Sequence, residues 1–472
     1  MKTLKFKNIL YISLAVISLN TSCSDYFDLQ DNPTLVSNPN LNGMLTTATH
    51  KAAMNSFNLS YIISNYCQYT ASPTPGSATD NYEPTNNSST WNALYYALSD
   101  VQDLIDKATA ENAYHHLGIG QLLMAYQLGL VADAWGSAPY SEAFMKANTF
   151  QPKFDSEEDL YNAQASLITE GLANLEKSSS VSLGQNADLI HGNNIQQWIK
   201  TGYALQARLL NKISKKSTYN PTAVLSAIDK SYQSNSDDAG MKVFNGINPW
   251  AQVARDNENL LLDGWLSANF INHLNGIKFG FEDPRIKFIT EKSIVGNIYI
   301  GTVNGQGNVG SNSLKDECYI SRKSPLTKDD APVTIVSYAE VKMIEAEAAL
   351  RANNRGRAYQ AYLEGIKAHF NKLGVEQAEL DDYLTKPIVA VGEDNLTLDD
   401  IFREKYIITY LNPEAWNDLR RFDYQIKDFN MPVNAKLPTF IRRLAYPSSE
   451  RAENGANVPA EVSLDTKLWW DQ

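Results

Sequence analysis

The sequence is poor in the residues that bind metals or carry redox chemistry. It has only three cysteines and six histidines among 472 residues, and no two cysteines stand at the spacing of a zinc or redox motif. Cys67 and Cys318 lie far apart in sequence, so they either pair in an oxidising compartment or remain separate buried thiols. The consecutive His115 and His116 diverge on a helix, which argues against a metal site there. We therefore expect neither a metal centre nor a cofactor.

Basic residues are outnumbered by acidic ones. The chain has 41 lysines and arginines against 53 aspartates and glutamates, which gives a formal net charge of -12 at pH 7. A protein that binds nucleic acid needs a basic surface to neutralise phosphates. Nucleic acid is therefore not an expected partner.

Recognisable catalytic motifs are also missing. The sequence has no G-x-S-x-G or H-E-x-x-H motif and no cysteine with a suitable partner. Two pairs of adjacent acids, Asp381 with Asp382 and Asp399 with Asp400, match the residue type that glycosidases use. Neighbouring side chains on a helix point apart, however, and such pairs usually line a solvated face. The sequence favours a protein without catalytic residues, and a glycan hydrolase is the weaker alternative.

A long apolar run is found only near the N-terminus. Three early lysines precede an apolar run over residues 9–19, which is too short to span a bilayer, and together they predict a signal peptide over residues 1–22. Cys23, directly after small residues, resembles the lipid-attachment site of bacterial lipoproteins, although Asn20 departs from the aliphatic residue usual in that motif. Residues 23–40 are acidic and rich in turns, and are expected to be a lipid-anchored tether. Their acids serve either as a surface-export signal or as a solvated linker.

Helical periodicity dominates the rest of the sequence. Between Ile335 and Gly374, apolar and small residues recur at spacings of three and four on both sides of a polar break at residues 353–356. This predicts two antiparallel helices in a tetratricopeptide-like hairpin. One hairpin cannot bury its apolar face alone, so further helices must stack against it. The same periodicity predicts helices over residues 42–69, 91–110, 114–135, 156–177, 193–216, 221–233, 397–411 and 413–422.

Two segments interrupt the helical pattern. Residues 71–90 contain three prolines, a glycine and many short polar side chains, and are expected to form a long exposed loop. Residues 236–334 form an insert of loops and short helices, with a short strand hairpin expected near residues 295–303. The glycine-rich residues 301–312 lack the lysine and the strand-to-helix context of a phosphate-binding loop. We expect them to form a flexible surface loop.

Residues 397–472 are expected to complete the fold with a helix pair and an extended polar segment. In all, we expect residues 41–472 to form a single, all-α dominated domain. Its tetratricopeptide-like hairpins, over about 91–235 and 335–374, would pack against an irregular, loop-rich region. Charges of both signs in the helix pair predict a salt-bridge network that fixes this pair to the hairpins. Its members are Arg403, Glu404, Glu414, Asp418, Arg420 and Arg421.

Six segments, spread in order over nearly the whole mature chain, form a pattern beyond periodicity. They are VADAWGSAPYSEAF, WIKTGYALQARLLNKIS, LNGIKFGFEDPRIKFI, SYAEVKMIEAEAALR, EKYIITYLNPEAWNDLRRF and RRLAYPSSERAEN. In this order behind a lipoprotein-type cysteine, they resemble the SusD/RagB family of nutrient-binding outer-membrane lipoproteins. The resemblance implies four tetratricopeptide-like units and a lipid-anchored position on the cell surface. It also implies capture of a nutrient, often an oligosaccharide and sometimes a peptide, for a SusC-like TonB-dependent transporter.

Aromatic and polar side chains in the two irregular segments are the candidate ligand-binding residues. A sugar ring has polar edges and an apolar face, so its sites combine aromatic rings with hydrogen-bonding side chains. We expect the nutrient to bind where the residue 71–91 loop meets residues 245–285. Trp91 and Trp265 stand at helix starts and suit a core position equally well. The candidates are Asp80, Tyr82, Trp91, Asn92, Trp250, Asp263, Trp265 and Asn269.

A peptide ligand and a protein-binding scaffold remain the alternatives. Tetratricopeptide-like hairpins elsewhere hold protein partners, so the helices could contact the transporter while the loops hold the nutrient. The identity of the nutrient does not follow from the sequence.

Overall fold

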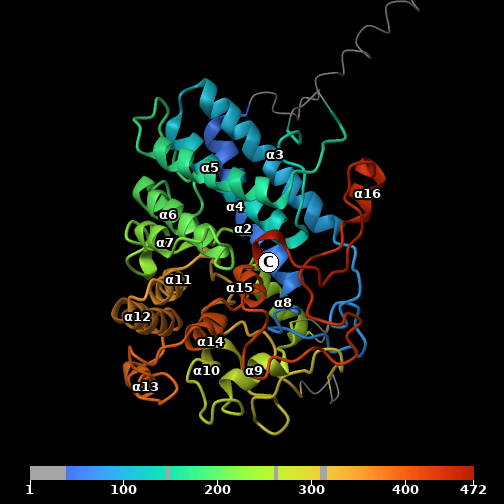
Figure 1. The fold of residues 1–472 in the computed structure, drawn as a ribbon, viewed down its shortest axis with the longest axis vertical. Coiled ribbons are helices and arrows are strands. Elements are labelled where there is room, and N and C mark those ends of the chain that lie inside the picture. The colour runs from blue at the N-terminus through green and yellow to red at the C-terminus, as the bar shows by residue number, and fades with distance from the viewer. Residues whose placement is uncertain (1–38, 145–148, 260–263, 309–315) are drawn as a thin grey trace, which may run out of the picture. The chain divides into compact units, whose positions relative to one another are not determined.

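Helix hairpins make up most of the structure, as the periodicity predicted (Figure 1). The computed structural model describes residues 39–144, 149–259, 264–308 and 316–472, so the predicted signal peptide, Cys23 and most of the tether lie outside the described residues. Residues Leu41–Gln472 form one compact unit. Its α-helices are α2 (Leu41–Ile63), α3 (Ser88–Ala110), α4 (Tyr114–Trp135), α5 (Glu157–Leu175), α6 (Ile195–Lys212), α7 (Pro221–Ile228), α8 (Pro249–Glu258), α9 (Ala268–Leu274), α10 (Ile286–Ile289), α11 (Tyr338–Arg351), α12 (Arg355–Leu373), α13 (Gln377–Tyr383), α14 (Leu398–Ile408), α15 (Glu414–Arg421) and α16 (Ser448–Asn454).

Helix α4 is the centre of the N-terminal hairpins. Nearly all of its residues are buried, which is the pattern of a helix enclosed by others. Helices α3 and α5 pack along it, and small residues permit the close approach to α5. A Cβ added at Gly118 would lie 2.7 Å from the carbonyl oxygen of Gly171. Of the described helices, only α4 is long and apolar enough to span a membrane, but it lies inside the protein.

The predicted hairpin over residues 335–374 is confirmed as α11 and α12. The hydroxyl of Ser337 accepts the N–H of Glu340 and so caps α11. The side chain of Asn354 caps α12 in the same way, and Gly374 ends that helix in a left-handed conformation. Local capping and apolar periodicity therefore specify this hairpin together.

Replacing Ala346 by leucine is expected to lower the stability of this hairpin. Ala346 is fully buried on α11, so three added carbons must displace packed neighbours, at a cost of about 1 to 3 kcal/mol. Chemical unfolding would measure the loss, with Ala352→Leu at the exposed end of α11 as the control. Unchanged stability in A346L would contradict the packing of this face.

The insert holds the short helices predicted for it, α8, α9 and α10, but its strands lie elsewhere than predicted. The prediction of a strand hairpin near residues 295–303 is wrong. This stretch forms only isolated β-bridges, at its end, within the described residues. In the part of the chain that the structure describes, the strands are instead β1 (Ala239–Met241) and β2 (Val333–Val336), which pair antiparallel and tie the ends of the insert together. Helices α13 and α16 form in segments predicted to be polar or extended.

The prediction of a flexible surface loop is wrong for residues 301–308. Thr302 is fully buried and Asn304 is 5% exposed. The backbone of Thr302 bonds to Leu266 and Ala268, and the carbonyl oxygen of Asn304 accepts the N–H of Val433. The side chains of Thr302 and Asn304 donate to Glu317 and to the carbonyl oxygen of Thr70. Residues 309–312 of the glycine-rich segment lie outside the described residues.

The charged network predicted for the C-terminal helix pair is confirmed for Arg403, Glu404, Glu414, Asp418 and Arg421. The prediction is wrong for Arg420, which forms no ion pair among the described residues, because its buried guanidinium donates instead to the carbonyl oxygens of Asp133 and Arg442 and to Asn417. Arg421 on α15 contacts Glu347 on α11 at 2.8 Å and Asp418 at 2.7 Å. Glu404 on α14 contacts Arg285, which begins α10, at 2.8 Å. The pair is therefore fixed both to the hairpins and to the insert.

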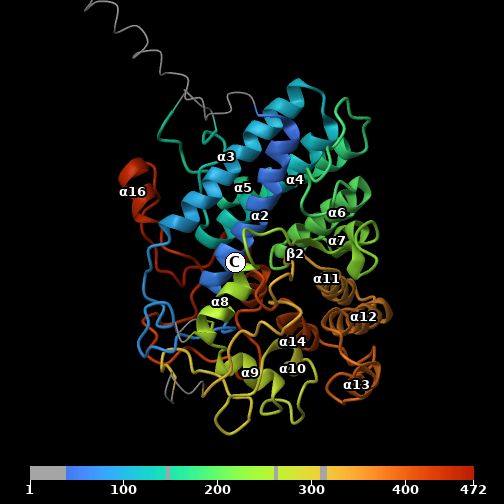
Figure 2. The ribbon, with the colours of Figure 1, turned by 180° about the vertical axis from the view of Figure 1, so that it is seen from behind.

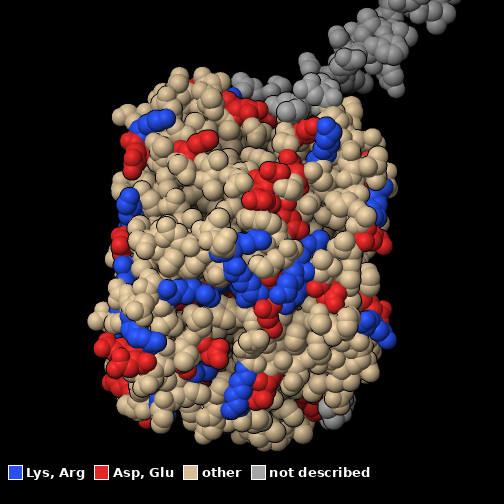
Figure 3. Space-filling model, viewed as in Figure 1, with Lys and Arg blue, Asp and Glu red and all other residues tan. Residues whose placement is uncertain are grey.

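Charges near the C-terminal end of the chain also pair. Lys215 and Lys467 contact Asp423 at 2.8 and 3.0 Å, and Arg442 contacts Asp423 and the buried Asp471. On the face of the molecule seen in Figure 1, Figure 3 shows basic side chains gathered near the middle, with acidic side chains beside them. Lys215 and Arg442, through Asp471, and Lys467, through Asp423, hold the last segment against the rest of the structure.

Candidate ligand-binding site

Two adjoining hollows open beside the C-terminal part of α2. One, of about 340 Å³, lies between α2, the 70–87 loop and α8. The other, of about 460 Å³, lies between α2, α8 and residues 245–247. Tyr61 and Val253 line both, so we treat them as one site, the α2–α8 hollow. Each has the volume of a small-molecule site, and Figure 2 shows α8 beside the end of α2.

Three aromatic rings form the floor of the α2–α8 hollow. Phe57 and Tyr61 lie one helical turn apart on α2, and Trp250 lies in the first turn of α8. The centroids of Phe57 and Trp250 are 4.8 Å apart, edge to face, and Tyr61 lies 6.4 Å from Trp250. Tyr61 is 43% exposed, whereas Trp250 is 5% exposed. Tyr61 therefore offers its ring to a ligand, and Trp250 supports it.

The start of α8 fixes the position of Trp250. The Oδ1 of Asn248 accepts the N–H of Trp250 at 2.7 Å, and its Nδ2 donates to the carbonyl oxygen of Ala331 at 2.7 Å. Pro249 occupies the start of the helix, where no N–H donor is needed. Because Asn248 is fully buried, this cap is part of the core. This cap therefore fixes Trp250 within the aromatic floor.

Polar groups, uncharged except for Arg255, line the other walls of the α2–α8 hollow. Hydroxyl and amide groups both donate and accept hydrogen bonds, as sugar hydroxyls and peptide groups do. Arg255 lines the hollow from the exposed side of α8. The polar residues on the loop side are Asn65, Thr70, Ser72, Ser77, Thr79, Thr85 and Asn87.

Five of the residues predicted to bind ligand are buried, and four of these do not line the α2–α8 hollow. Tyr82, Trp91 and Trp265 are at most 2% exposed, and Asp80 is fully buried. Trp91 packs edge to face on Trp135 with their centroids 5.1 Å apart. These side chains leave almost no surface for a ligand, so we assign them to the core that shapes the site.

The other four predicted residues lie in different places. Trp250 lines the α2–α8 hollow. Asn269 lines a separate hollow of about 270 Å³, where its Oδ1 accepts a hydrogen bond from Lys278. Asn92 is half-buried on α3. Asp263 lies outside the described residues.

The two irregular segments do lie against each other. The N–H of Ala71 donates to the carbonyl oxygen of Trp265 at 3.0 Å, and Thr70 pairs with Leu266 in a bridge. The α2–α8 hollow lies along this contact. Sequence reasoning therefore indicated this region but missed Phe57 and Tyr61, because aromatic residues one helical turn apart are typical of any core face.

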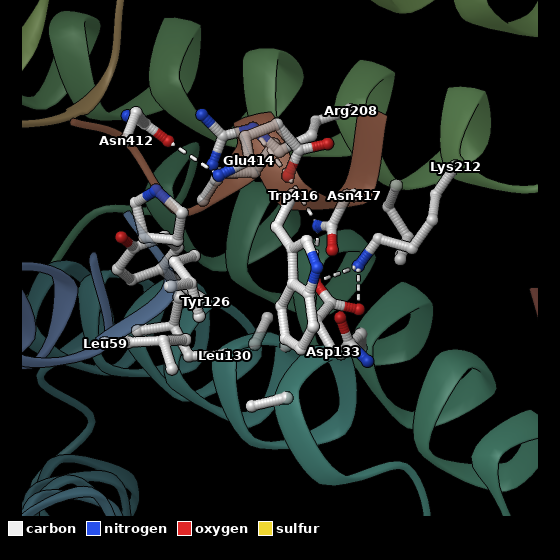
Figure 4. Close-up of a pocket in the computed structure, with 18 of the residues that line it drawn as sticks. Leu59, Tyr126, Leu130, Asp133, Arg208, Lys212, Asn412, Glu414, Trp416 and Asn417 are labelled. Atoms are coloured by element: carbon white, nitrogen blue, oxygen red, sulfur yellow. Dashed lines mark hydrogen bonds and ion pairs between the residues drawn. The ribbon is translucent and has the colours of Figure 1, made fainter. Parts of the chain in front are cut away.

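A third cavity is enclosed between α4, α6 and α15 (Figure 4). It has a volume of about 50 Å³, enough for a few water molecules. Lys212 contacts Asp133 at 2.6 Å, and the amide of Asn417 donates to Asp133 and to Glu414. Because these groups already bond to one another, we assign the cavity to the structural core.

Side chains that ligate metals are dispersed. Among the described residues, no three His, Cys, Asp or Glu side chains are grouped so that they could hold a metal ion. Cys67 and Cys318 are separate buried thiols, so the pairing left open by the sequence does not occur.

A scaffold of helix hairpins that presents an aromatic hollow defines a ligand-binding protein. Residues 32–447 match the SusD-like family described as starch-binding and associating with the outer membrane, and the chain belongs to this family. The resemblance in the sequence is thereby confirmed. No curated protein matches this chain.

Solved structures of SusD-like proteins share the fold. A SusD/RagB family protein from Bacteroides thetaiotaomicron is 20% identical with a TM-score of 0.76, over 92% of this chain and 99% of the other. A chitin-binding SusD homolog from Flavobacterium johnsoniae is 21% identical with a TM-score of 0.76, over 91% and 98%. A SusD homolog from Bacteroides fragilis is 21% identical with a TM-score of 0.75, over 92% and 100%. At these identities the likeness shows the fold alone.

Proposed function

We propose that this protein is a cell-surface lipoprotein of the outer membrane that captures an oligosaccharide in the α2–α8 hollow. It then delivers this ligand to a SusC-like, TonB-dependent transporter. The exposed ring of Tyr61, which lies beside Trp250 among polar walls that are uncharged except for Arg255, is the observation that carries the proposal. The family description names starch and one structural relative binds chitin, which supports a glycan as the ligand.

The aromatic floor would supply most of the binding energy. Stacking a sugar face on Tyr61 removes apolar surface from water, which is worth about 25 cal/mol per Å². Hydrogen bonds at an exposed site mostly replace bonds to water and contribute less. We therefore expect modest affinity with little salt dependence for a neutral glycan.

Tyr61→Ala is expected to weaken glycan binding at least about tenfold while the protein stays folded, because the lost ring carries the apolar contact. Calorimetry with malto-oligosaccharides, chito-oligosaccharides and short peptides would measure this. Tyr96→Ala is the matched control, since Tyr96 is a 68% exposed tyrosine on α3 that does not line the hollow. Equal affinity of Y61A and wild type would show that the site lies elsewhere.

The same panel separates the alternatives. Binding of peptides alone would keep the fold and replace the glycan by a peptide ligand. Transporter capture without binding of any small ligand would favour a scaffold. Release of glycan fragments in amounts that rise with the amount of protein added would favour a hydrolase. Adjacent acids such as Asp381 and Asp382 argue against this, because their side chains diverge on α13.

Cys23→Ala is expected to move the protein from the membrane fraction to the soluble fraction or to leave an uncleaved precursor. The reason is that a thioether-linked lipid can form only on a thiol, and the acyl chains supply the membrane affinity. Fractionation and mass spectrometry of the mature N-terminus would check this. Protease digestion of intact cells would then test exposure on the outer face. An unchanged membrane fraction in C23A would rule out the lipid anchor.

A further inference from the structure

The glycine-rich residues 301–308 interlock with the 70–87 loop beside the α2–α8 hollow. The N–H of Gly76 donates to the carbonyl oxygen of Gly305 at 3.2 Å. The N–H of Asn308 donates to the carbonyl oxygen of Pro73 at 3.1 Å. Each segment therefore supplies a backbone donor to the other, although they are far apart in sequence.

The buried carboxylate of Asp80 joins the same two segments. Its Oδ2 accepts the N–H of Ser72 at 2.8 Å and the N–H of Gly305 at 3.2 Å. Its Oδ1 accepts the amide of Asn65 at 2.7 Å and the amide of Asn304 at 3.3 Å. All four donors are uncharged, so the negative charge of the carboxylate is stabilised by N–H groups from the turn after α2, the 70–87 loop and residues 301–308. These hydrogen bonds act against the rise in the pKa of Asp80 that burial causes. Removing that charge would leave buried donors without a strong acceptor.

Glycines permit the two segments to come this close. Gly305 and Gly307 have φ angles of +83° and +79°, which residues with a Cβ rarely adopt. A Cβ at Gly307 would lie 2.7 Å from the carbonyl oxygen of Pro73 and from the nitrogen of Pro75. A side chain at position 307 would therefore push against the 70–87 loop.

This interlock holds residues that face the hollow. Asn65, Ser72 and Pro73 all line the α2–α8 hollow. Asn65 and Ser72 donate to Asp80, and Pro73 accepts from Asn308. The position of these wall residues therefore depends on hydrogen bonds to Asp80 and Asn308, which do not line the hollow.

We propose that Asp80 and residues 301–308 form a positioning device that fixes the 70–87 loop for ligand binding without touching the ligand. In this role Asp80 is a positioning residue, and the glycine-rich segment is the support on which the loop rests. The effect on affinity rests on the proposed function of the hollow, whereas the coupling of the two segments does not.

Hydrogen exchange of the ligand-free protein tests the coupling directly. In Asp80→Asn, amides of residues 70–77 and residues 301–308 are expected to exchange at least about tenfold faster together, because both lose an acceptor. Asp188→Asn is the matched control: Asp188 is a buried carboxylate that accepts the N–H groups of Ile190, His191 and Asn193 and the indole of Trp198. D188N should accelerate exchange only near its own loop.

Gly307→Ala provides a second test that leaves the carboxylate in place. We again expect amide hydrogen exchange to become faster in residues 70–77 and residues 301–308 together. If D80N fails to fold, this variant still tests the proposal. Faster exchange in only one segment, or in neither, for the folded variants would overturn the proposal.

Affinity adds a separate readout, with maltoheptaose and chitohexaose as probes. For either probe that wild type binds, D80N should weaken binding at least about tenfold, while D188N of similar melting temperature should not. Equal affinity in D80N and wild type would overturn the positioning role. If wild type binds neither probe, the glycan proposal loses support, and the exchange experiment still decides the coupling.

Discussion

Replacing Glu347 by alanine is expected to destabilise the protein by about 3 to 5 kcal/mol, the cost of breaking a buried charge pair by removing one partner. Glu347 is fully buried on α11. Its oxygens accept hydrogen bonds from Arg421 at 2.8 and 2.9 Å, from Arg351 at 3.0 Å and from Asn211 at 2.9 Å. Without the carboxylate, the buried guanidinium of Arg421 retains only part of its charge compensation, from Asp418.

Chemical unfolding of E347A against Asp100→Ala would measure this cost. Asp100 and Lys51 form an ion pair of which each side chain is about 40% exposed, so its loss should cost only about 0 to 1 kcal/mol. A similar small loss in both variants would contradict the claim that the C-terminal helices are fixed by buried charge. Loss of binding by the folded fraction of E347A is not expected, because Glu347 does not line the α2–α8 hollow.

The ion pairs of Glu347 with Arg421 and Arg351 also predict that the folded protein loses stability in acid. Burial alone would raise the pKa of Glu347, but the charges of Arg421 and Arg351 outweigh it and hold the pKa well below its usual range. Since the unfolded chain takes up this proton at a higher pH than the folded chain, stability falls as pH drops below the ordinary pKa of a glutamate. We expect E347A to lose less of its remaining stability than wild type over that acid range.

The repeating part of the fold could be predicted because its signals are local. Ser156 and Thr397 each cap the helix that follows, as their spacing to the next acid indicated. For the salt-bridge network, the sequence indicated only the charged residues of the C-terminal helix pair and not all of their partners. The charges of α14 and α15 are evident in the sequence, but their partners Glu347 and Arg285 come from α11 and the insert.

The candidate site was harder to predict because it depends on which aromatic residues remain exposed. Tyr61 and Trp265 look alike as apolar side chains, yet one is 43% exposed and the other 1%. Exposure here follows from how the 70–87 loop and α8 cover α2, and these contacts join segments far apart in sequence. The burial of residues 301–308 has the same origin, because glycines predict flexibility until a second segment packs against them.

Replacing Trp265 by alanine is expected to destabilise the protein by about 3 to 5 kcal/mol, as for other large aromatic side chains removed from a core. Trp265 is 1% exposed. Its carbonyl oxygen also accepts the N–H of Ala71, so the cavity would open where the insert meets the 70–87 loop. Chemical unfolding of W265A, with Trp265→Phe as a smaller deletion, should give a graded loss of stability.

Ligand binding by the folded fraction of W265A distinguishes the site predicted from sequence from the site that the structure favours. If the α2–α8 hollow holds the ligand, W265A should lose stability and keep most of its affinity. The lost ring lies outside the lining of the hollow, and the variant keeps both the backbone carbonyl that Ala71 contacts and the Asp80 contacts that position the 70–87 loop. Tyr61→Ala should show the reverse, since the exposed ring contributes little to the core. A W265A protein as stable as wild type that binds weakly would mean that Trp265 faces the ligand, and the α2–α8 hollow would then have to be abandoned as the binding site.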